Sequence, residues 1–143
     1  METLLKKICV IDGQGGGIGS HMIKQLRNAF KETIEIMALG TNAIATTQML
    51  KAGANRGASG ENAIAQTVKK ADIIVGPIGI VMAHAMMGEV TPAMAEAISA
   101  SPARKFLIPL TQENIVISGV AALPLPMLVE TMIAEEINPF LGE

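Results

Sequence analysis

The sequence predicts an α/β fold: a Rossmann-like, three-layer α/β/α sandwich with a mostly parallel sheet of about five or six strands. Apolar runs of strand length alternate with segments whose apolar residues recur at helical spacing. Strands separated by helices form right-handed crossovers, and therefore a parallel sheet with helices on both faces. Glycines and small polar residues follow most of the apolar runs, and ligands bind at these carboxyl ends of the strands in such a sheet.

The expected first unit is a strand, a glycine-rich turn and a helix. Residues Ile8–Ile11 form an uninterrupted apolar run, which is typical of a strand buried on both faces. After Asp12 and the glycines, the side chains of Ile18, Met22 and Leu26 fall on one face of an amphipathic helix. We expect this face to pack against the sheet.

The middle of the chain predicts two more strands and two more helices. The expected elements are a strand Thr33–Leu39 closed by Gly40, a helix from about Asn42 to Ala52 stopped by Gly53, a short strand within Ala54–Ser59, and a helix from a Ser59 cap to about Ala71.

The last part of the chain predicts three strands and two helices. The expected elements are the strands Asp72–Val75, Phe106–Ile108 and Ile115–Ile117, a helix that begins at Thr91-Pro92, and a final helix from Pro126 towards Asn138. Pro139 is expected to end the final helix, because proline cannot continue the helical hydrogen-bond pattern.

Length and composition fit a single domain over residues 1–143 with a large apolar core. The hydrophobic fraction is 50%, and charged residues make up 17% where about 25% is usual. This chain is more apolar than a monomer needs. We therefore expect a homo-oligomer, in which a second copy covers part of the apolar surface.

Charge and residue content exclude several classes of partner. A net charge of −2, with no Trp or Tyr, argues against a nucleic-acid partner, which needs a basic face and stacking platforms. The longest uncharged stretches fall short of the ~20 residues of a spanning helix, and no signal-peptide core precedes Asp12. We expect a cytoplasmic protein without a membrane partner. The single Cys, Cys9, is expected to be a buried, inert thiol.

The loop Asp12-Gly13-Gln14-Gly15-Gly16-Gly17-Ile18-Gly19 carries the main functional signal. Its spacing is not G-x-G-x-x-G but G-x-x-x-G-I-G, which is similar to the loop of short-chain dehydrogenases. We expect Gly13 to permit the tight turn, Gly17 to let the backbone approach a ligand, and Gly19 to bring the helix close to the strand. Free N–H groups at a helix start attract anions. The loop therefore predicts phosphate or nucleotide binding, with a turn that serves packing alone as the alternative.

Two absences bear on this interpretation. Dinucleotide sites usually place an acidic residue after the second strand for the ribose, or an Arg for a 2′-phosphate, but here the chain has Gly40-Thr41-Asn42. Thr41 or Asn42 is a candidate for bonding a hydroxyl, and Asn42 is also a candidate helix cap. Short-chain dehydrogenases use a catalytic Tyr, and this sequence has none. The loop Gly76-Pro77-Ile78-Gly79 is expected to close the site.

Other polar residues give weaker signals. No Lys follows Gly19, which disfavours P-loop hydrolysis, and the two His residues lack carboxylates at ligand spacing, so we expect no metal site. His21 is either a phosphate contact or a partly exposed helix residue, and His84 is expected in a buried or interface helix.

Three further features have both a functional and a structural interpretation. The Met-rich stretch Met82–Met87, together with Met94, is typical of an adaptable subunit contact. Residues Arg56, Glu61 and Asn62 form either a functional trio near the pocket or ordinary turn chemistry with a helix-start carboxylate. Asp12 would repel a phosphate unless it bonds a ribose, a substrate hydroxyl or a cation.

Five segments resemble one family: IDGQGGGIG, ALGTNAIAT, AGANRGASGENAI, GPIGIV and GEVTPAMAEAI. Together they span nearly the whole chain and are similar to a small bacterial family of uncharacterised proteins, a domain of unknown function. The resemblance implies a cytoplasmic, Rossmann-like protein. It implies no reaction and no catalytic residues, which therefore stay unassigned.

The sequence favours one function and leaves two alternatives open. We expect a small phosphorylated ligand, such as a nucleotide, a dinucleotide of the NAD(P) type or another phosphorylated molecule, over Gly13–Gly19, with Thr41-Asn42 and Gly76–Gly79 closing the site. The first alternative is a non-catalytic ligand-sensing or accessory protein that assembles as a homo-oligomer through its Met-rich helix. The second is a purely structural oligomer.

Overall fold

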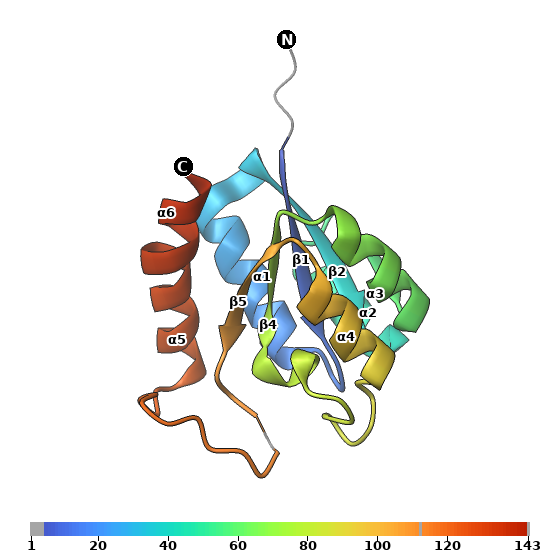
Figure 1. Ribbon diagram of the computed structural model, residues 1–143. Helices are drawn as coiled ribbons and strands as arrows, with labels where there is room; N and C mark the ends of the chain where they lie inside the picture. Colours follow the sequence, from blue (N-terminus) through green and yellow to red (C-terminus); the bar gives the residue numbers. More distant parts are fainter. Residues whose placement is uncertain (1–4, 112, 143) are drawn as a thin grey trace.

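In the computed structural model, which describes residues 5–111 and 113–142, a parallel sheet forms the centre of the molecule (Figure 1). The strands are hydrogen-bonded in the order β3-β2-β1-β4-β5, and every pair is parallel. Their bounds are β1 Lys6–Asp12, β2 Ile34–Gly40, β3 Arg56–Ser59, β4 Ile73–Pro77 and β5 Arg104–Ile108. The α/β, Rossmann-like fold class is therefore confirmed, with five strands in this part of the chain.

Helices cover both faces of the sheet, as expected for crossovers between parallel strands. The α-helices are α1 Gly17–Phe30, α2 Ala43–Lys51, α3 Glu61–Thr67, α4 Pro92–Ala100, α5 Leu125–Thr131 and α6 Asn138–Leu141. Short helical turns add η1 Lys31–Thr33, η2 Val68–Lys70, η3 Ile78–Val81 and the π-helix η4 Met132–Ile137. One face carries α1, α2 and the α5–α6 segment, and the other carries α3, η3 and α4.

Strand β1 is buried on both faces, which explains its unbroken apolar run. Ile8 and Val10 belong to the core cluster under α1, and Cys9 and Ile11 belong to the cluster under α3 and α4. The side chain of Cys9 is inaccessible to solvent, and burial raises the pKa of its thiol to about 12. The predicted burial of Cys9 is confirmed, and the raised pKa disfavours the reactive thiolate.

The order of the strands reverses next to β1. Strand β1 pairs with β2 on one side, with Asp12 opposite Gly40, and with β4 on the other side, with Val10 opposite Val75. The chain builds outward from β1 to β3 and then crosses back to β4. At such a reversal the loops after neighbouring strands diverge and leave a crevice at the carboxyl ends of the strands.

The structure confirms two of the predicted helix-capping residues and contradicts a third. Asn42 and Thr91 cap α2 and α4, because their side-chain oxygens accept the N–H groups of Ala45 and Met94. The predicted Ser59 cap is wrong. Gly60 precedes α3, and the Ser59 hydroxyl instead bonds the Thr46 hydroxyl at 2.7 Å.

The predicted strand Ile115–Ile117 is wrong, because the chain there is irregular. Pro109 follows β5 directly and has no N–H with which to extend the ladder. The chain then leaves the sheet, and the orange loop in Figure 1 projects from the body of the molecule. Val116 is 91% exposed as a result. Apolarity over three residues is not sufficient to form a strand without a neighbour to pair with.

The predicted end of the final helix at Pro139 is also wrong. The helix starts at Leu125, passes through a π-helical turn and continues to Leu141. In the π turn the N–H of Asn138 donates to the carbonyl of Ile133, five residues back. Pro139 follows directly after this change of hydrogen-bond register and lies in the first turn of α6, where a missing N–H costs little.

The contact between β1 and β4 allows no side chain at Gly76. A Cβ on Gly76 would lie 2.5 Å from the carbonyl oxygen of Ile11. We predict that Gly76→Ala lowers the free energy of unfolding by about 1–3 kcal/mol, because the two strands must separate. Urea unfolding followed by far-ultraviolet circular dichroism measures the change. Gly15→Ala is the matched control, since a Cβ there meets nothing within 4 Å, and equal losses for both variants would contradict the prediction.

Candidate functional site

The glycine loop joins β1 to α1 in a tight turn whose left-handed residues are Gln14 and Gly16. Gly16 has φ +72°, and a Cβ there would lie 2.9 Å from the carbonyl oxygen of Ala45. The N–H of Gly16 donates to the carbonyl of Gly13 at 2.9 Å and closes the turn. Backbone freedom is thus required at Gly16 rather than at Gly13, where the sequence placed it.

Gly13 and Gly19 are glycines because neighbouring side chains approach them closely. A Cβ on Gly13 would lie 2.5 Å from Thr41 Oγ1 and 2.6 Å from Met86 Sδ. A Cβ on Gly19 would lie 2.5 Å from Met49 Sδ. The predicted role of Gly19, close packing of the helix, is therefore confirmed.

Asp12 points into the glycine loop. Its Oδ1 accepts the N–H of Gly13 at 2.8 Å and its Oδ2 accepts the N–H of Gly19 at 2.7 Å. The carboxylate thereby caps α1, whose N-cap, Gly16, has no side chain. Asp12 is 4% exposed, and burial raises the pKa of its carboxyl more than the two N–H groups lower it.

The backbone at Gly15 and Gly17 lies at the surface of the glycine loop. Both glycines are exposed, and a Cβ on either would meet nothing within 4 Å. Within the described part of the chain neither N–H has a hydrogen-bond acceptor. Asp12 occupies the inner donors of the loop, so these two remain for a ligand at the N-terminus of the 14-residue helix α1.

A second carboxylate, Glu89, lies on the outer side of the same loop. Its Oε1 accepts the N–H of Gln14 at 2.8 Å, the hydroxyl of Thr41 at 2.7 Å and the amide of Asn42 at 2.8 Å. Partial burial raises the pKa of Glu89, but the three hydrogen bonds outweigh it and hold the pKa below its ordinary value. Glu89 is therefore ionised at neutral pH.

Sequence reasoning missed Glu89, although one signal points to it. Glu89 is the single Asp, Glu, Lys or Arg in residues 73–95, in the segment that follows β4. That segment begins at the same edge of the sheet as the glycine loop and the Thr41-Asn42 turn. A lone charge in an apolar segment after a buried strand is a candidate site residue.

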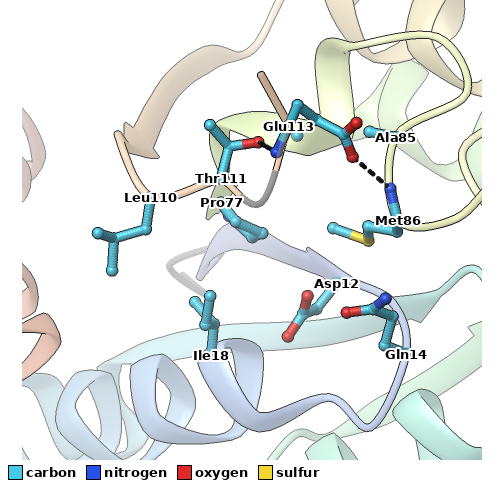
Figure 2. Close-up of a pocket in the computed structure, with 10 residues that line it drawn as sticks. Asp12, Gln14, Ile18, Pro77, Ala85, Met86, Leu110, Thr111 and Glu113 are labelled. Atoms are coloured by element: carbon cyan, nitrogen blue, oxygen red, sulfur yellow. Dashed lines mark hydrogen bonds between the residues drawn. The ribbon is translucent and has the colours of Figure 1, made fainter. Parts of the chain in front are cut away.

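The crevice at the carboxyl ends of the strands contains a cavity of about 260 Å³. Figure 2 shows its walls, which come from the loops after β1, β4 and β5. The lining residues are Asp12, Gln14, Ile18, Pro77, Gly79, Ala85, Met86, Leu110, Thr111 and Glu113. The Glu113 carboxylate accepts the N–H of Met86 at 3.0 Å and so joins two of these loops. Among the described residues that line the cavity there is no Lys or Arg.

The structure places the predicted site residues in two groups. Asp12, Gln14, Ile18, Pro77 and Gly79 line the cavity. Thr41 and Asn42 lie beside it with Glu89, and Asn42 caps α2 at the same time as it bonds the carboxylate. The remaining predicted site residues belong to the elements around these groups. They are Gly13, Gly15, Gly16, Gly17 and Gly19 in the turn and the start of α1, Gly40 at the end of β2, Gly76 in β4, and Ile78 at the start of η3.

The Met-rich stretch is not a helix. Residues 82–90 form consecutive turns, with positive φ at His84, Met86, Met87 and Gly88. The N–H of Met86 bonds Glu113 instead of a helical carbonyl. Met87 is 94% exposed and His84 is exposed. The predicted helix and the predicted burial of His84 are therefore wrong, whereas a subunit contact of this stretch stays a prediction.

The trio of Arg56, Glu61 and Asn62 does not form. Arg56 pairs with Glu35 at 2.6 Å, and Glu61 accepts the hydroxyl of Thr91 at 2.6 Å. His21 lies in the second turn of α1 and does not line the cavity. Among residues 5–111 and 113–142, no three His, Cys, Asp or Glu side chains are placed to hold a metal ion. No helix there is long and apolar enough to cross a bilayer.

The parallel sheet, the glycine turn and the crevice define a Rossmann-like α/β protein. The chain belongs to the family described as domain of unknown function DUF3842, whose model matches residues 7–140. The resemblance seen in the sequence is confirmed. Among curated proteins, none matches the sequence.

Several solved structures share this fold, among them a universal stress protein and a UbiX-like decarboxylase. A universal stress protein in complex with cAMP is 18% identical, with a TM-score of 0.43, over 74% of this chain and 98% of that chain. A dodecameric FMN-dependent UbiX-like decarboxylase from Escherichia coli O157:H7 is 14% identical, with a TM-score of 0.45, over 95% of this chain and 94% of that chain. The likeness concerns the α/β fold alone.

We predict that Asp12→Asn lowers the free energy of unfolding at pH 7 by about 1–3 kcal/mol. The amide NH₂ replaces one acceptor oxygen, so the N–H of Gly13 or of Gly19 loses its partner. Urea unfolding measures the loss. Glu96→Gln, which changes an exposed carboxylate on α4, is the control and should leave stability unchanged.

The same pair of proteins should differ in pH dependence. The folded-state pKa of Asp12 is raised above 3.8, so on raising the pH the unfolded chain loses this proton first, and folding becomes less favourable. The advantage of the wild type over Asp12→Asn should therefore shrink as the pH rises from 3.8 towards neutrality. An advantage that grows over this range would contradict the assignment.

Proposed function

We propose that this protein binds a nucleotide or another phosphorylated small molecule in the crevice at the carboxyl ends of β1, β4 and β5. The observation that carries the proposal is the pair of N–H groups at the exposed Gly15 and Gly17, which have no acceptor among the described residues and lie at the N-terminus of α1 between the cavity-lining residues Gln14 and Ile18. Backbone donors and the helix dipole favour a phosphate there. The cavity supplies an apolar wall for the remainder of the ligand, from Ile18, Pro77 and Leu110.

Charge around the cavity limits which phosphorylated ligands fit. Asp12 and Glu113 line it and Glu89 adjoins it, whereas the lining contains no Lys or Arg among the described residues. The described lining thus offers a phosphate no cationic side chain, and the proposed phosphate contacts are the backbone N–H groups. Such a site favours a ligand with one or two phosphates over a triphosphate, whose extra charge would meet the carboxylates. Ligands of this class include nucleoside diphosphates and dinucleotides of the NAD type.

We predict that Gly17→Asp abolishes binding of nucleoside diphosphates without unfolding the protein. A side chain at this position meets open space, and an acidic residue in the first turn of a helix is tolerated, but its charge repels a phosphate. Gly17→Asn is the matched control, of similar shape and without the charge. Thermal unfolding followed with a dye reports binding, because ligand at about 100 times its Kd adds roughly 2.7 kcal/mol.

Native mass spectrometry of the freshly purified protein complements this test by revealing a retained ligand. A thermal-unfolding midpoint that no nucleotide or phosphorylated metabolite raises, together with no retained mass, would contradict the proposed function. Equal binding by Gly17→Asp and Gly17→Asn would place the ligand elsewhere.

A second candidate function is a non-catalytic ligand-sensing homo-oligomer. The specific observation is a group of exposed apolar side chains in the segment between β5 and α5 and at the start of α5. They are Ile115, Val116, Val120, Leu123 and Met127. Exposed apolar side chains clustered in this way favour a contact with another copy. The contact would involve this segment rather than the Met-rich stretch, and it would adjoin the cavity wall at Leu110 and Thr111.

We predict that Val116→Asp lowers the oligomeric state of the protein. Val116 is 91% exposed, so the change costs the monomer little and places a charge in the contact. Met87→Asp is the matched control, because Met87 is 94% exposed on the Met-rich stretch. Sedimentation equilibrium should show a smaller particle for Val116→Asp alone. A monomeric wild type, or an effect of Met87→Asp alone, would contradict this contact.

A further inference from the structure

The turn after β2 is the place where a dinucleotide-binding fold holds a ribose. A carboxylate after the second strand accepts the ribose hydroxyls in such folds. Here that turn is Thr41-Asn42, and neither residue is acidic. The structure brings a carboxylate to the turn from another part of the chain, because Glu89 Oε1 lies 2.7 Å from Thr41 Oγ1 and 2.8 Å from Asn42 Nδ2.

The hydrogen bonds to Glu89 hold its side chain in one orientation and favour its ionised form. Three donors from two different loops bind the same oxygen, Oε1. Within the described part of the chain the second oxygen, Oε2, has no donor, and Glu89 is only partly buried. An ionised carboxylate with one oxygen anchored and the other free is an acceptor for hydroxyl groups.

Glu89 lies next to the proposed phosphate donors along the glycine loop. Glu89 is bonded to Gln14, and Gln14 directly precedes Gly15, which is exposed. A phosphate at the start of α1 would therefore have its ribose next to Gln14 and Glu89. The same carboxylate repels a phosphate on the ribose 2′ position, because two anions would meet there with no Lys or Arg among the three groups that bond Glu89.

We propose that Glu89, positioned by Gln14, Thr41 and Asn42, accepts the hydroxyls of a ribose that carries no 2′-phosphate. This inference rests on the proposed function, since it names the class of nucleotide that the site takes. The ligand is a ribonucleotide with a free 2′,3′-diol. Neither a deoxyribonucleotide nor a 2′-phosphorylated dinucleotide makes the same contact.

The test compares four ribonucleoside diphosphates with their 2′-deoxy counterparts by isothermal titration calorimetry on the whole protein. Each hydroxyl bonded to an ionised acceptor strengthens binding by about tenfold or more. The wild type should prefer the best-bound ribonucleotide over its deoxy form by at least about this factor. Glu89→Gln should weaken the ribonucleotide by a similar factor and should weaken the deoxy form, which keeps only its 3′-hydroxyl, by less, so that the preference for ribose falls.

Glu61→Gln is the control for a structural effect. Glu61 bonds Thr91, two residues beyond Glu89, and so braces the same part of the chain without reaching the glycine loop. This variant should keep the preference for ribose. A preference for ribose that is undiminished in Glu89→Gln would overturn the inference. So would a gain in affinity for both ligands in Glu89→Gln, because the carboxylate would then be occupying the place of a ligand anion.

Inorganic pyrophosphate separates failure of this inference from failure of the proposed function. In one outcome the protein binds pyrophosphate and binds ribonucleoside and deoxyribonucleoside diphosphates with equal affinity. That result would overturn the role of Glu89 and leave the phosphate site at Gly15 and Gly17 in place. Binding of neither pyrophosphate nor any nucleoside diphosphate would overturn the proposed function, and the role of Glu89 would be overturned with it.

Discussion

The two hydrogen bonds of the Asp12 carboxylate are the contacts on which the site depends. They tie the end of β1 to the first turn of α1, through the N–H groups of Gly13 and Gly19. A helix that begins with glycines has no side chain of its own to cap it, and Asp12 supplies that cap from the preceding strand. The carboxylate takes the N–H groups of Gly13 and Gly19, whereas those of the exposed Gly15 and Gly17 have no acceptor among the described residues. The turn that completes the fold therefore also presents the donors.

The crevice follows from the way β1 is buried. Helices on both faces of the sheet hold β1 in the centre, and the order of the strands reverses between β1 and β4. Any loop after these strands must turn away from its neighbour, so the carboxyl ends enclose a space whatever the loops contain. Here the loops contribute carboxylates and backbone donors rather than cations. The topology thus places the site, and the loop chemistry decides which ligand suits it.

Local patterns predicted most of the elements and little of how the site is assembled. The strands that form the sheet and the helices α1, α2 and α4 follow from runs, periodicity and caps that act over a few residues. The bond between Gln14 and Glu89 joins residues 75 apart, and no local pattern specifies such a contact. The same limit explains the missed turns of residues 82–90, whose conformation depends on Glu113. The wrong prediction at Pro139 has a different, local reason: the register of the helix changes just before it, and ordinary helical spacing does not predict such a π turn.

The segment of residues 82–90 links recognition to local stability. Three of its non-glycine residues, His84, Met86 and Met87, have positive φ, a conformation that costs roughly 1–2 kcal/mol for each such residue. Two carboxylate contacts oppose this cost, one from Glu113 to the N–H of Met86 and one from Glu89 to the glycine loop. A ligand of the kind we propose, bonded to Glu89, would engage an anchor of this segment. Its binding would then be coupled to the order of the segment through a single side chain, and it would stabilise the cavity wall that Ala85 and Met86 form.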